Sequence, residues 1–224
     1  KFARVTLATN NIDFRSRVSS KEELDFLASV PTSATYKDID NADHVVLINF
    51  EPEDESPIVF LRIYKQVHKR SIKVTTIAAL ASRGSQKLKA NLIKTAAGNE
   101  VSAINSISGL TGKSVVLVGE RAAETQGALS AVAKLVKESG AKLGWVPRRA
   151  GERGAIAAGA LPNLLPGARP IEDASARVDI ATAWSVDSVP TTAGMSTEEI
   201  INSDLQAILI GGVDPMDISS DAKV

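Results

Sequence analysis

One segment near residue 50 constrains the fold more than any other part of the chain. Four consecutive apolar residues, Val45 to Ile48, are followed by an acidic turn and then by Ser56-Pro57. This run is too short for a helix, and its continuity is typical of a strand covered on both faces, as in parallel sheets. Ser56 suits an N-cap, and Pro57 suits the first position of a helix. The segment therefore predicts a buried strand over 44–50, a polar turn and a helix over 57–70.

The helix expected over 57–70 has a single apolar face. Its apolar residues follow the spacing i, i+3, i+4 and i+7, and they are Phe60, Ile63, Tyr64 and Val67. The remaining positions are largely basic, as on a helix that packs one face on a sheet and leaves the other in water. The acidic residues 53–55 precede its start, where the positive end of the helix dipole favours them.

The same alternation of strand and helix continues along the chain. Further strands are expected at 73–80, 114–119, 141–146 and 207–211, and helices at 21–29, 99–107, 123–139, 152–159 and 197–202. This order predicts an α/β fold with mostly parallel sheets and right-handed crossovers. Gly109 to Gly112 is the best internal boundary. We therefore expect a helical lead-in and a first Rossmann-like α/β unit in 1–110. A second Rossmann-like unit, incomplete at its C-terminal end, is expected in 111–224.

Composition excludes several classes of function. The chain of 224 residues has no cysteine, which excludes disulfides, iron–sulfur clusters and cysteine-bound metals within it. Lys+Arg and Asp+Glu both number 26, so no global field attracts nucleic acid. Aromatic residues make up only 4%, which argues against a platform that stacks bases. No apolar run approaches the ~20 residues that a membrane-spanning helix needs.

Two polar turns are candidate binding sites, because ligands of open α/β sheets bind at the carboxyl ends of strands. The candidate residues are Asn49, Glu51 and Pro52 in the first turn and Gly211, Gly212 and Asp214 in the second. The polar side chains could bind a sugar or nucleotide, and the glycines permit close approach of the backbone. Alternatively, these residue types simply serve a sharp turn. Neither turn matches the Gly-x-Gly-x-x-Gly fingerprint of dinucleotide sites.

A cluster of arginines follows the strand expected at 141–146. Arg148, Arg149 and Arg153 would lie near the carboxyl edge of the sheet, where guanidiniums suit a phosphate or a carboxylate. The alternative is ion pairing with Glu152 or with a partner subunit.

No set of residues indicates catalysis. The two histidines, His44 and His68, are expected to be structural or solvated. No serine lies in a Gly-x-Ser-x-Gly motif, and no histidine–carboxylate pair has the spacing of metal ligands. We therefore predict no catalytic residue and no metal site.

Several motifs occur in an order that identifies a family. They are Thr9–Asp13, Ala42–His44 leading into Asn49–Pro57, Ala96–Glu100, Trp145–Ala155 continuing into Gly159–Gly167, and Gly211–Pro215. This order resembles the molybdopterin oxidoreductase family over nearly the whole chain. Within that family it is most similar to the large peripheral-arm subunits of bacterial respiratory complex I, of the actinobacterial type. The chain is expected to be a fragment of such a subunit.

The resemblance implies a pair of Rossmann-like domains, as in the central domains of formate dehydrogenase and DMSO reductase. In catalytic members these domains hold the guanosine ends of molybdopterin guanine dinucleotides. By position, Asn49–Pro52 and Gly211–Pro215 are the two nucleotide turns. Here Glu51 and Asp214 replace the expected asparagines and would repel phosphates. No cysteine is present to ligate molybdenum, so we expect both turns to be vestigial.

The resemblance also implies a role in an electron-transfer complex. The expected function is a non-catalytic scaffold that supports electron transfer from NADH to quinone, peripheral on the cytoplasmic side of the bacterial inner membrane. Its partners would be other peripheral-arm subunits and the iron–sulfur domains of the same chain, without nucleic acid or membrane insertion. One alternative is a domain that binds molybdopterin guanine dinucleotide in a catalytic molybdenum oxidoreductase. Another is a free-standing α/β protein that binds a sugar or nucleotide.

Overall fold

The computed structural model describes residues 1–15, 17–29 and 34–218, which form two compact units. The first, here called the sheet unit, comprises Thr32–Arg148. The second, here called the ribbon unit, joins Lys1–Pro31 to Arg149–Val224. Each unit is described by itself.

The sheet unit is built on five parallel strands in the order β3-β2-β1-β4-β5. The strands are β1 (His44–Ile48), β2 (Lys73–Ala78), β3 (Asn91–Lys94), β4 (Val115–Gly119) and β5 (Lys142–Val146). The helices are α3 (Tyr36–Asn41), α4 (Pro52–Glu55), α5 (Pro57–Arg70), α6 (Arg83–Lys87), α7 (Glu100–Asn105), the 3₁₀ helix η1 (Glu120–Glu124) and α8 (Ala128–Ser139). This arrangement confirms the predicted α/β class and its parallel sheet.

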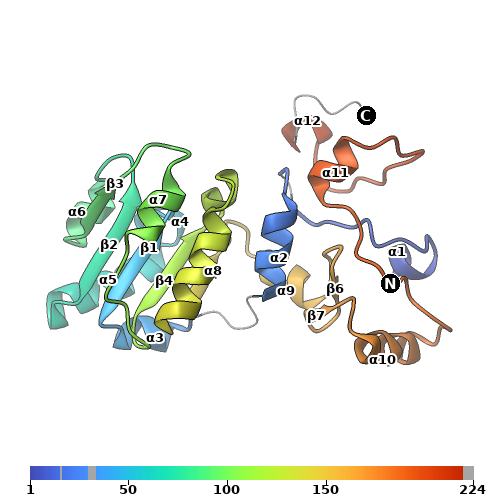
Figure 1. The fold of residues 1–224 in the computed structure, drawn as a ribbon, viewed down its shortest axis with the longest axis horizontal. Coiled ribbons are helices and arrows are strands. Elements are labelled where there is room, and N and C mark those ends of the chain that lie inside the picture. Colours follow the sequence, from blue (N-terminus) through green and yellow to red (C-terminus); the bar gives the residue numbers. More distant parts are fainter. Residues whose placement is uncertain (16, 30–33, 219–224) are drawn as a thin grey trace. The chain divides into compact units, whose positions relative to one another are not determined.

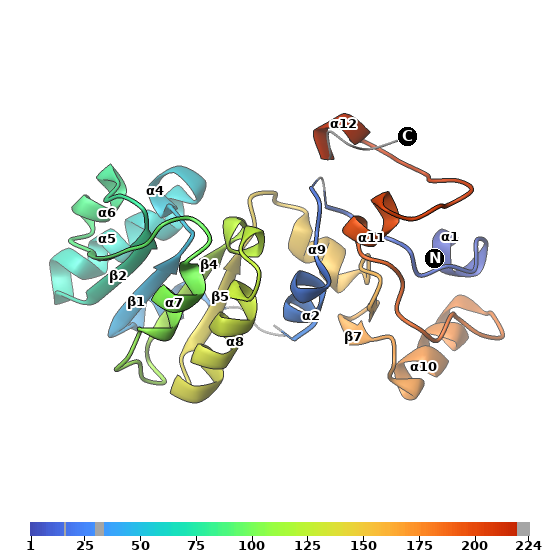
Figure 2. The same cartoon turned by 45° about the horizontal axis from the view of Figure 1, so that its top comes forward.

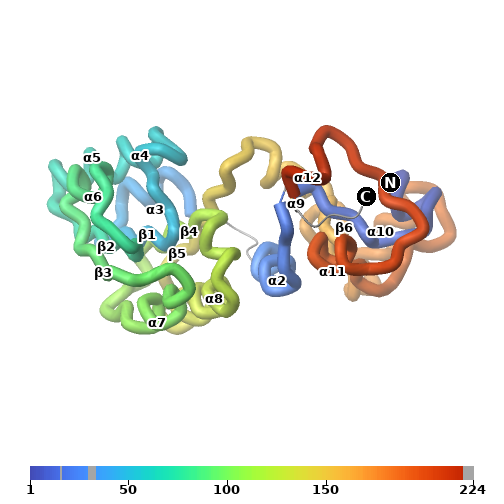
Figure 3. The backbone as a smooth tube through the Cα atoms, turned by 90° about the horizontal axis from the view of Figure 1, so that it is seen from above, coloured from blue at the N-terminus to red at the C-terminus, as the bar shows by residue number. Residues whose placement is uncertain are grey.

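The sheet lies between two layers of helices. Helices α3, α4, α5 and α6 cover one face, and α7 and α8 cover the other (Figures 1 to 3). Strand β1 is central, with Val45 opposite Val74 of β2 on one side and Val115 of β4 on the other. The chain therefore runs from β1 outward to β3 and then returns to the opposite side of β1. This reversal creates a switch point between β1 and β4, the place where open α/β sheets bind ligands.

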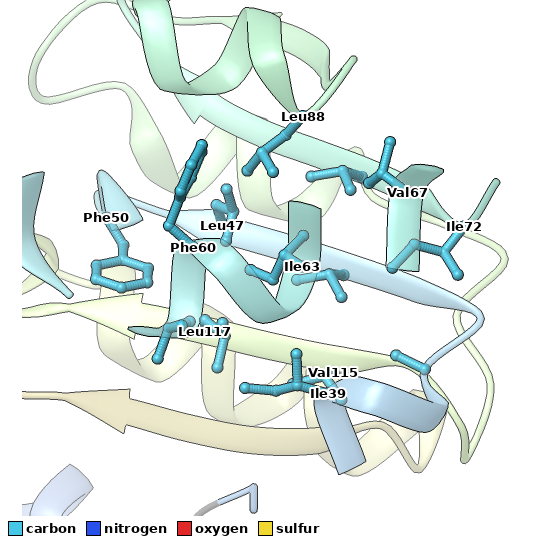
Figure 4. Close-up of a cluster of buried hydrophobic side chains, with 14 residues drawn as sticks. Ile39, Leu47, Phe50, Phe60, Ile63, Val67, Ile72, Leu88, Val115 and Leu117 are labelled. Carbon is cyan, nitrogen blue, oxygen red and sulfur yellow. The ribbon is translucent and has the colours of Figure 1, made fainter. Parts of the chain in front are cut away.

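Strand β1 is buried on both faces, as its sequence predicts. Leu47 belongs to the cluster that also contains Phe60 and Ile63 of α5 (Figure 4). Val46 and Ile48 alternate with these residues and are fully buried on the opposite face. The predicted helix over 57–70 is confirmed as α5, although Tyr64 is 38% exposed and lies on the flank of the helix rather than in its buried face.

Three features of the sheet unit differ from expectation. Because β4 pairs with β1, the stretch Gly109–Gly112 does not separate two sheets, and the strands expected at 114–119 and 141–146 join the first three. The predicted helix over 123–139 is divided at Gly127, whose φ of +82° lies in the left-handed region that glycine favours. Helix α3 is not among the helices predicted above. It begins with a capping box, in which the side chain of Thr35 accepts from the backbone N–H of Asp38 and the carboxylate of Asp38 accepts from the backbone N–H of Thr35.

The ribbon unit has little regular structure. Its elements are α1 (Phe2–Val5), α2 (Lys21–Ser29), α9 (Glu152–Ala157), the antiparallel pair β6 (Leu164–Leu165) and β7 (Arg169–Pro170), α10 (Ala174–Trp184), α11 (Thr197–Ile201) and α12 (Pro215–Ile218). The strand predicted over 207–211 is wrong, because this segment is not a strand and Leu209 is 81% exposed. Its apolar run has no neighbouring strand in the described chain to pair with, and a strand is stable only in a sheet.

A buried arginine organises the ribbon unit. Arg4 donates hydrogen bonds to the side chain of Asn10 at 2.7 Å and to the backbone carbonyls of Gly159, Leu161 and Leu164 at 2.6 to 2.9 Å. Burial lowers the pKa of Arg4 to about 10. The motif Thr9–Asp13 thus has a structural role here, since Asn10 joins Arg4 to the rest of the unit.

None of the helices in the described parts of the chain has both the length and the apolar character that crossing a bilayer requires.

Candidate functional site

A cleft of about 720 Å³ opens at the carboxyl ends of β1, β2 and β4, wholly within the sheet unit. It lies at the switch point between β1 and β4. Its polar lining comprises Asn49, Glu51, Asp54, Glu55, Thr76, Ser82, Ser85, Thr95, Glu100, Arg121, Glu124 and Arg148. Its position is therefore the one that ligand sites of open α/β sheets occupy.

The turn after β1 forms one wall of the cleft. Asn49 has a φ of +47°, in the left-handed region that asparagine tolerates better than most residues. Glu51 is the N-cap of α4, and Pro52 occupies the first turn of that helix. The carboxylate of Glu55 accepts a hydrogen bond from the backbone N–H of Glu51 at 2.8 Å. The acidic residues of the turn thus bond their own backbone, leaving fewer acceptors for a ligand.

Two glycines let neighbouring segments approach this turn closely. A Cβ atom on Gly119, at the end of β4, would lie only 2.5 Å from the carbonyl oxygen of Asn49. A Cβ atom on Gly84 of α6 would collide with the carboxylate of Glu51. Lys87, also on α6, pairs with Glu53. The turn is thus packed from both sides, and its shape depends on residues outside it.

An ion network joins three residues that line the cleft, Glu55, Arg121 and Arg148. Arg121 donates to a carboxylate oxygen of Glu55 at 2.6 Å and, through Nε, to the carbonyl oxygen of Asn49 at 3.3 Å. The other carboxylate oxygen of Glu55 lies 3.7 Å from Nε of Arg148. Two guanidiniums that could hold a phosphate are therefore already bound to a carboxylate of the chain.

Glu100 at the start of α7 completes the network on the other side. Its carboxylate accepts hydrogen bonds from Nδ2 of Asn49 at 3.4 Å and from the hydroxyl of Thr125 at 2.8 Å. Burial by itself would raise the pKa of Glu100, but these hydrogen bonds and those from nearby backbone N–H groups outweigh it and lower the pKa below its ordinary value. Glu100 is therefore held as an anion that fixes the side chain of Asn49.

The charge of the cleft does not suit a dinucleotide phosphate. Among the described residues, the lining contains five carboxylates and two guanidiniums, so acids are in excess. A pyrophosphate bound here would meet carboxylates and would have to displace Glu55 from Arg121 and Arg148. The chain also has no cysteine to supply a thiolate ligand to a metal. These residues therefore do not fit a molybdopterin guanine dinucleotide.

The predicted site residues differ in their surroundings. Asn49 and Glu51 line the cleft, whereas Pro52 is buried beneath the turn. Gly211, Gly212 and Asp214 belong to the ribbon unit, outside the cleft lining. There the carboxylate of Asp214 accepts a hydrogen bond from the backbone N–H of Met216 at 2.9 Å, as at the start of a helix.

Sequence reasoning missed most of the ion network. Arg121 and Glu100 were not candidates, and Glu55 was interpreted only as favourable to the helix dipole. A signal existed for Arg121, because it comes two residues after a parallel strand, at the same edge as Asn49. Arg148 forms an ion pair with Glu55, a partner that the sequence analysis did not name.

The histidines and carboxylates of the described residues were the remaining candidates for a metal site. His44 is buried and its Nε2 lies 2.9 Å from the hydroxyl of Thr75. Burial, together with the charge of Lys73, lowers the pKa of His44, so the ring is neutral near pH 7. Within the described residues, no group of three or more His, Cys, Asp or Glu is placed to hold a metal ion.

Comparison with known proteins places this cleft in a family context. A profile of the molybdopterin oxidoreductase family matches residues 1–223. The G subunits of the NADH-quinone oxidoreductases of Mycobacterium bovis and Mycobacterium tuberculosis are each 46% identical over 234 residues, covering 98% of this chain. The corresponding G subunit of Streptomyces coelicolor is 39% identical over 255 residues, covering 97% of this chain. The matched part is 29% to 30% of each relative, so the chain spans less than a third of their length.

Proposed function

Because the chain belongs to the molybdopterin oxidoreductase family, we propose that it is a non-catalytic module of an NADH:quinone oxidoreductase that keeps the family's sheet without its cofactor. The similarity to the G subunits of such enzymes supports this assignment. The observation that carries the non-catalytic part is the ion network of Glu55, Arg121 and Arg148. In this network, the two arginines that could bind a dinucleotide phosphate are paired with a carboxylate of the chain itself.

In this proposal the module serves as scaffold in the peripheral arm of the complex. Electron transfer belongs to iron–sulfur domains outside these residues, since the chain has no cysteine. Its partners are those domains and other peripheral-arm subunits, on the cytoplasmic side of the inner membrane. The vestigial nucleotide residues are Asn49, Glu51 and Pro52 in the first turn and Gly211, Gly212 and Asp214 in the second.

One observation favours the alternative, a working dinucleotide site. Oδ1 of Asn49 is buried and has no hydrogen-bond donor among the described residues. A guanine edge, with its N1–H and N2–H donors, would satisfy such an acceptor. The alternative is therefore worth testing with a guanine nucleotide.

Titration calorimetry of the purified chain with GMP and GDP tests the proposal. We expect no heat of binding, because carboxylates are in excess in the lining of the cleft and its two arginines are already paired with Glu55. Micromolar binding of one GDP, lost in Glu51→Ala but kept in the exposed control Glu138→Ala, would contradict it. Stoichiometric molybdenum or pterin in protein from the native organism, measured by elemental analysis and mass spectrometry, would contradict it as well.

A further inference from the structure

The outer face of α5 carries large apolar side chains that are exposed. The inner face is buried in the core through residues such as Ile63. On the outer face, Ile58 is 55% exposed and Leu61 is 57% exposed, one turn apart. Lys65 and Lys69 continue the same line at i+7 and i+11. These four residues are here called the α5 ridge.

Aromatic and arginine side chains are fixed on both flanks of the α5 ridge. On one flank, the guanidinium of Arg62 lies 4.4 Å from the ring centre of Tyr36 and donates to Asp40 at 2.6 Å. On the other, the rings of Tyr64 and His68 are 4.0 Å apart. Tyrosine and arginine are enriched in protein interfaces. Because these side chains are already held in place, they lose little entropy when a partner binds.

Charge is arranged in three zones along this surface. The exposed Asp54, which belongs to α4 and also lines the cleft, precedes the start of α5. The apolar pair Ile58 and Leu61 follows, and Lys65 and Lys69 lie toward the C-terminal end of α5. A helix placed antiparallel on this surface would match it best if its acidic residues lay near its N-terminus and its basic residues near its C-terminus. That distribution is the one that helix dipoles favour, and two antiparallel dipoles also attract each other.

We propose that the α5 ridge is the docking surface for an amphipathic helix of a neighbouring protein subunit, antiparallel to α5. Its apolar stripe would cover Ile58 and Leu61, and its acidic N-terminal turn would pair with Lys65 and Lys69. The inference rests on the proposed function, which supplies neighbouring subunits of a different kind. An anionic lipid surface matches less well, because it would repel the exposed Asp54.

Photo-crosslinking in the assembled enzyme tests the docking surface. In one strain, the photo-crosslinking amino acid benzoylphenylalanine is incorporated at position 61 in place of Leu61. In a second strain it replaces the exposed Lys137 of α8, on the opposite face of the sheet. After irradiation of the purified oxidoreductase, mass spectrometry identifies the linked peptide. We expect position 61 to link to an amphipathic helix of another subunit with acidic residues within two turns, and position 137 to link to that helix about tenfold less.

A second experiment tests the same docking surface by reversing the charges of two lysines. Lys65→Glu with Lys69→Glu should lower the amount of this chain recovered with the oxidoreductase about tenfold. Lys134→Glu with Lys137→Glu on α8 should leave recovery unchanged. Thermal unfolding of both double variants should match the unmodified protein, because all four side chains lie at the surface.

The outcomes separate the two claims. If the unmodified chain purifies with the oxidoreductase and position 61 links to nothing, to lipid or to a second copy of this chain, the docking proposal is overturned and the proposed function stands. If the unmodified chain is absent from the oxidoreductase, the proposed function is overturned, and the docking proposal falls with it.

Discussion

The turns after Ile48 and after Ile210 are similar in sequence and opposite in surroundings. Each follows an apolar run and ends at a proline that begins a short helix, α4 or α12. The first turn is packed by Gly119, Gly84 and an ion network. The second leaves Gly211 and Gly212 with open space where a Cβ would point. The comparison indicates that a strand-to-helix turn lines a binding cleft because of the strands and helices packed around it. The sequence of the turn is not sufficient.

Substitution of the packed glycine should have the largest effect on this contrast. Gly119→Ala places a methyl group 2.5 Å from the carbonyl oxygen of Asn49, so β4 or the turn must shift. We expect a loss of about 2–3 kcal/mol in the free energy of unfolding, measured with urea. Gly211→Ala, which meets no described atom within 4 Å, should change it by less than about 0.5 kcal/mol. Equal losses in the two variants would show that the turns are packed alike.

Removal of a charged partner should have an intermediate effect. Arg121→Ala leaves the mostly buried carboxylate of Glu55 without its 2.6 Å partner. Because Arg121 is 40% exposed, solvent screens the pair, and we expect a loss of about 1 kcal/mol. Asp214→Ala removes one exposed hydrogen bond at the start of α12 and should cost about 0.5 kcal/mol or less. If Asp214→Ala lowered the free energy of unfolding more than Arg121→Ala in the same urea experiment, the expected difference between the two turns would be wrong.

The smallest effect should appear as a dependence on pH. The folded state lowers the pKa of Glu100 below its ordinary value of 4.5, so its contribution to stability is complete above that value. It is lost as the pH falls through the lower pKa of the folded state. Relative to Glu100→Gln, the unmodified protein should therefore lose stability as the pH is lowered below about 4.5.

Urea unfolding of both proteins between pH 3 and pH 7 measures this difference. Glu138→Gln on α8 serves as the control for removing an exposed carboxylate, since its side chain is 66% exposed. A constant difference between the unmodified protein and Glu100→Gln at every pH would show that the hydrogen bonds from Asn49 and Thr125 do not hold the carboxylate.

Local periodicity predicted the sheet unit well. The continuous apolar run of β1 and the one-sided pattern of α5 each define an element from neighbouring residues alone. The segment 207–211 has the same kind of apolar run. A strand also needs a partner strand, however, and the spacing of residues does not indicate whether one is present. The prediction there therefore failed for lack of information about pairing.

Polar contacts between distant residues could not be predicted in the same way. Arg121 and Glu55 are 66 residues apart, and Arg4 and Leu164 are 160 residues apart. No spacing rule connects such pairs, because the fold alone brings them together. The location of the cleft at the carboxyl ends of the strands was predictable, whereas the charges that fill it were not.

The hydrogen bonds of Arg4 have a consequence for biosynthesis. Its acceptor at Gly159 is 155 residues further along, and the whole of the sheet unit is encoded between them. At a translation rate of ~5–20 residues per second, Arg4 is added to the chain roughly 8–30 s before Gly159. The N-terminal segment must therefore wait while the central sheet folds, and its guanidinium stays hydrated until the later loop arrives.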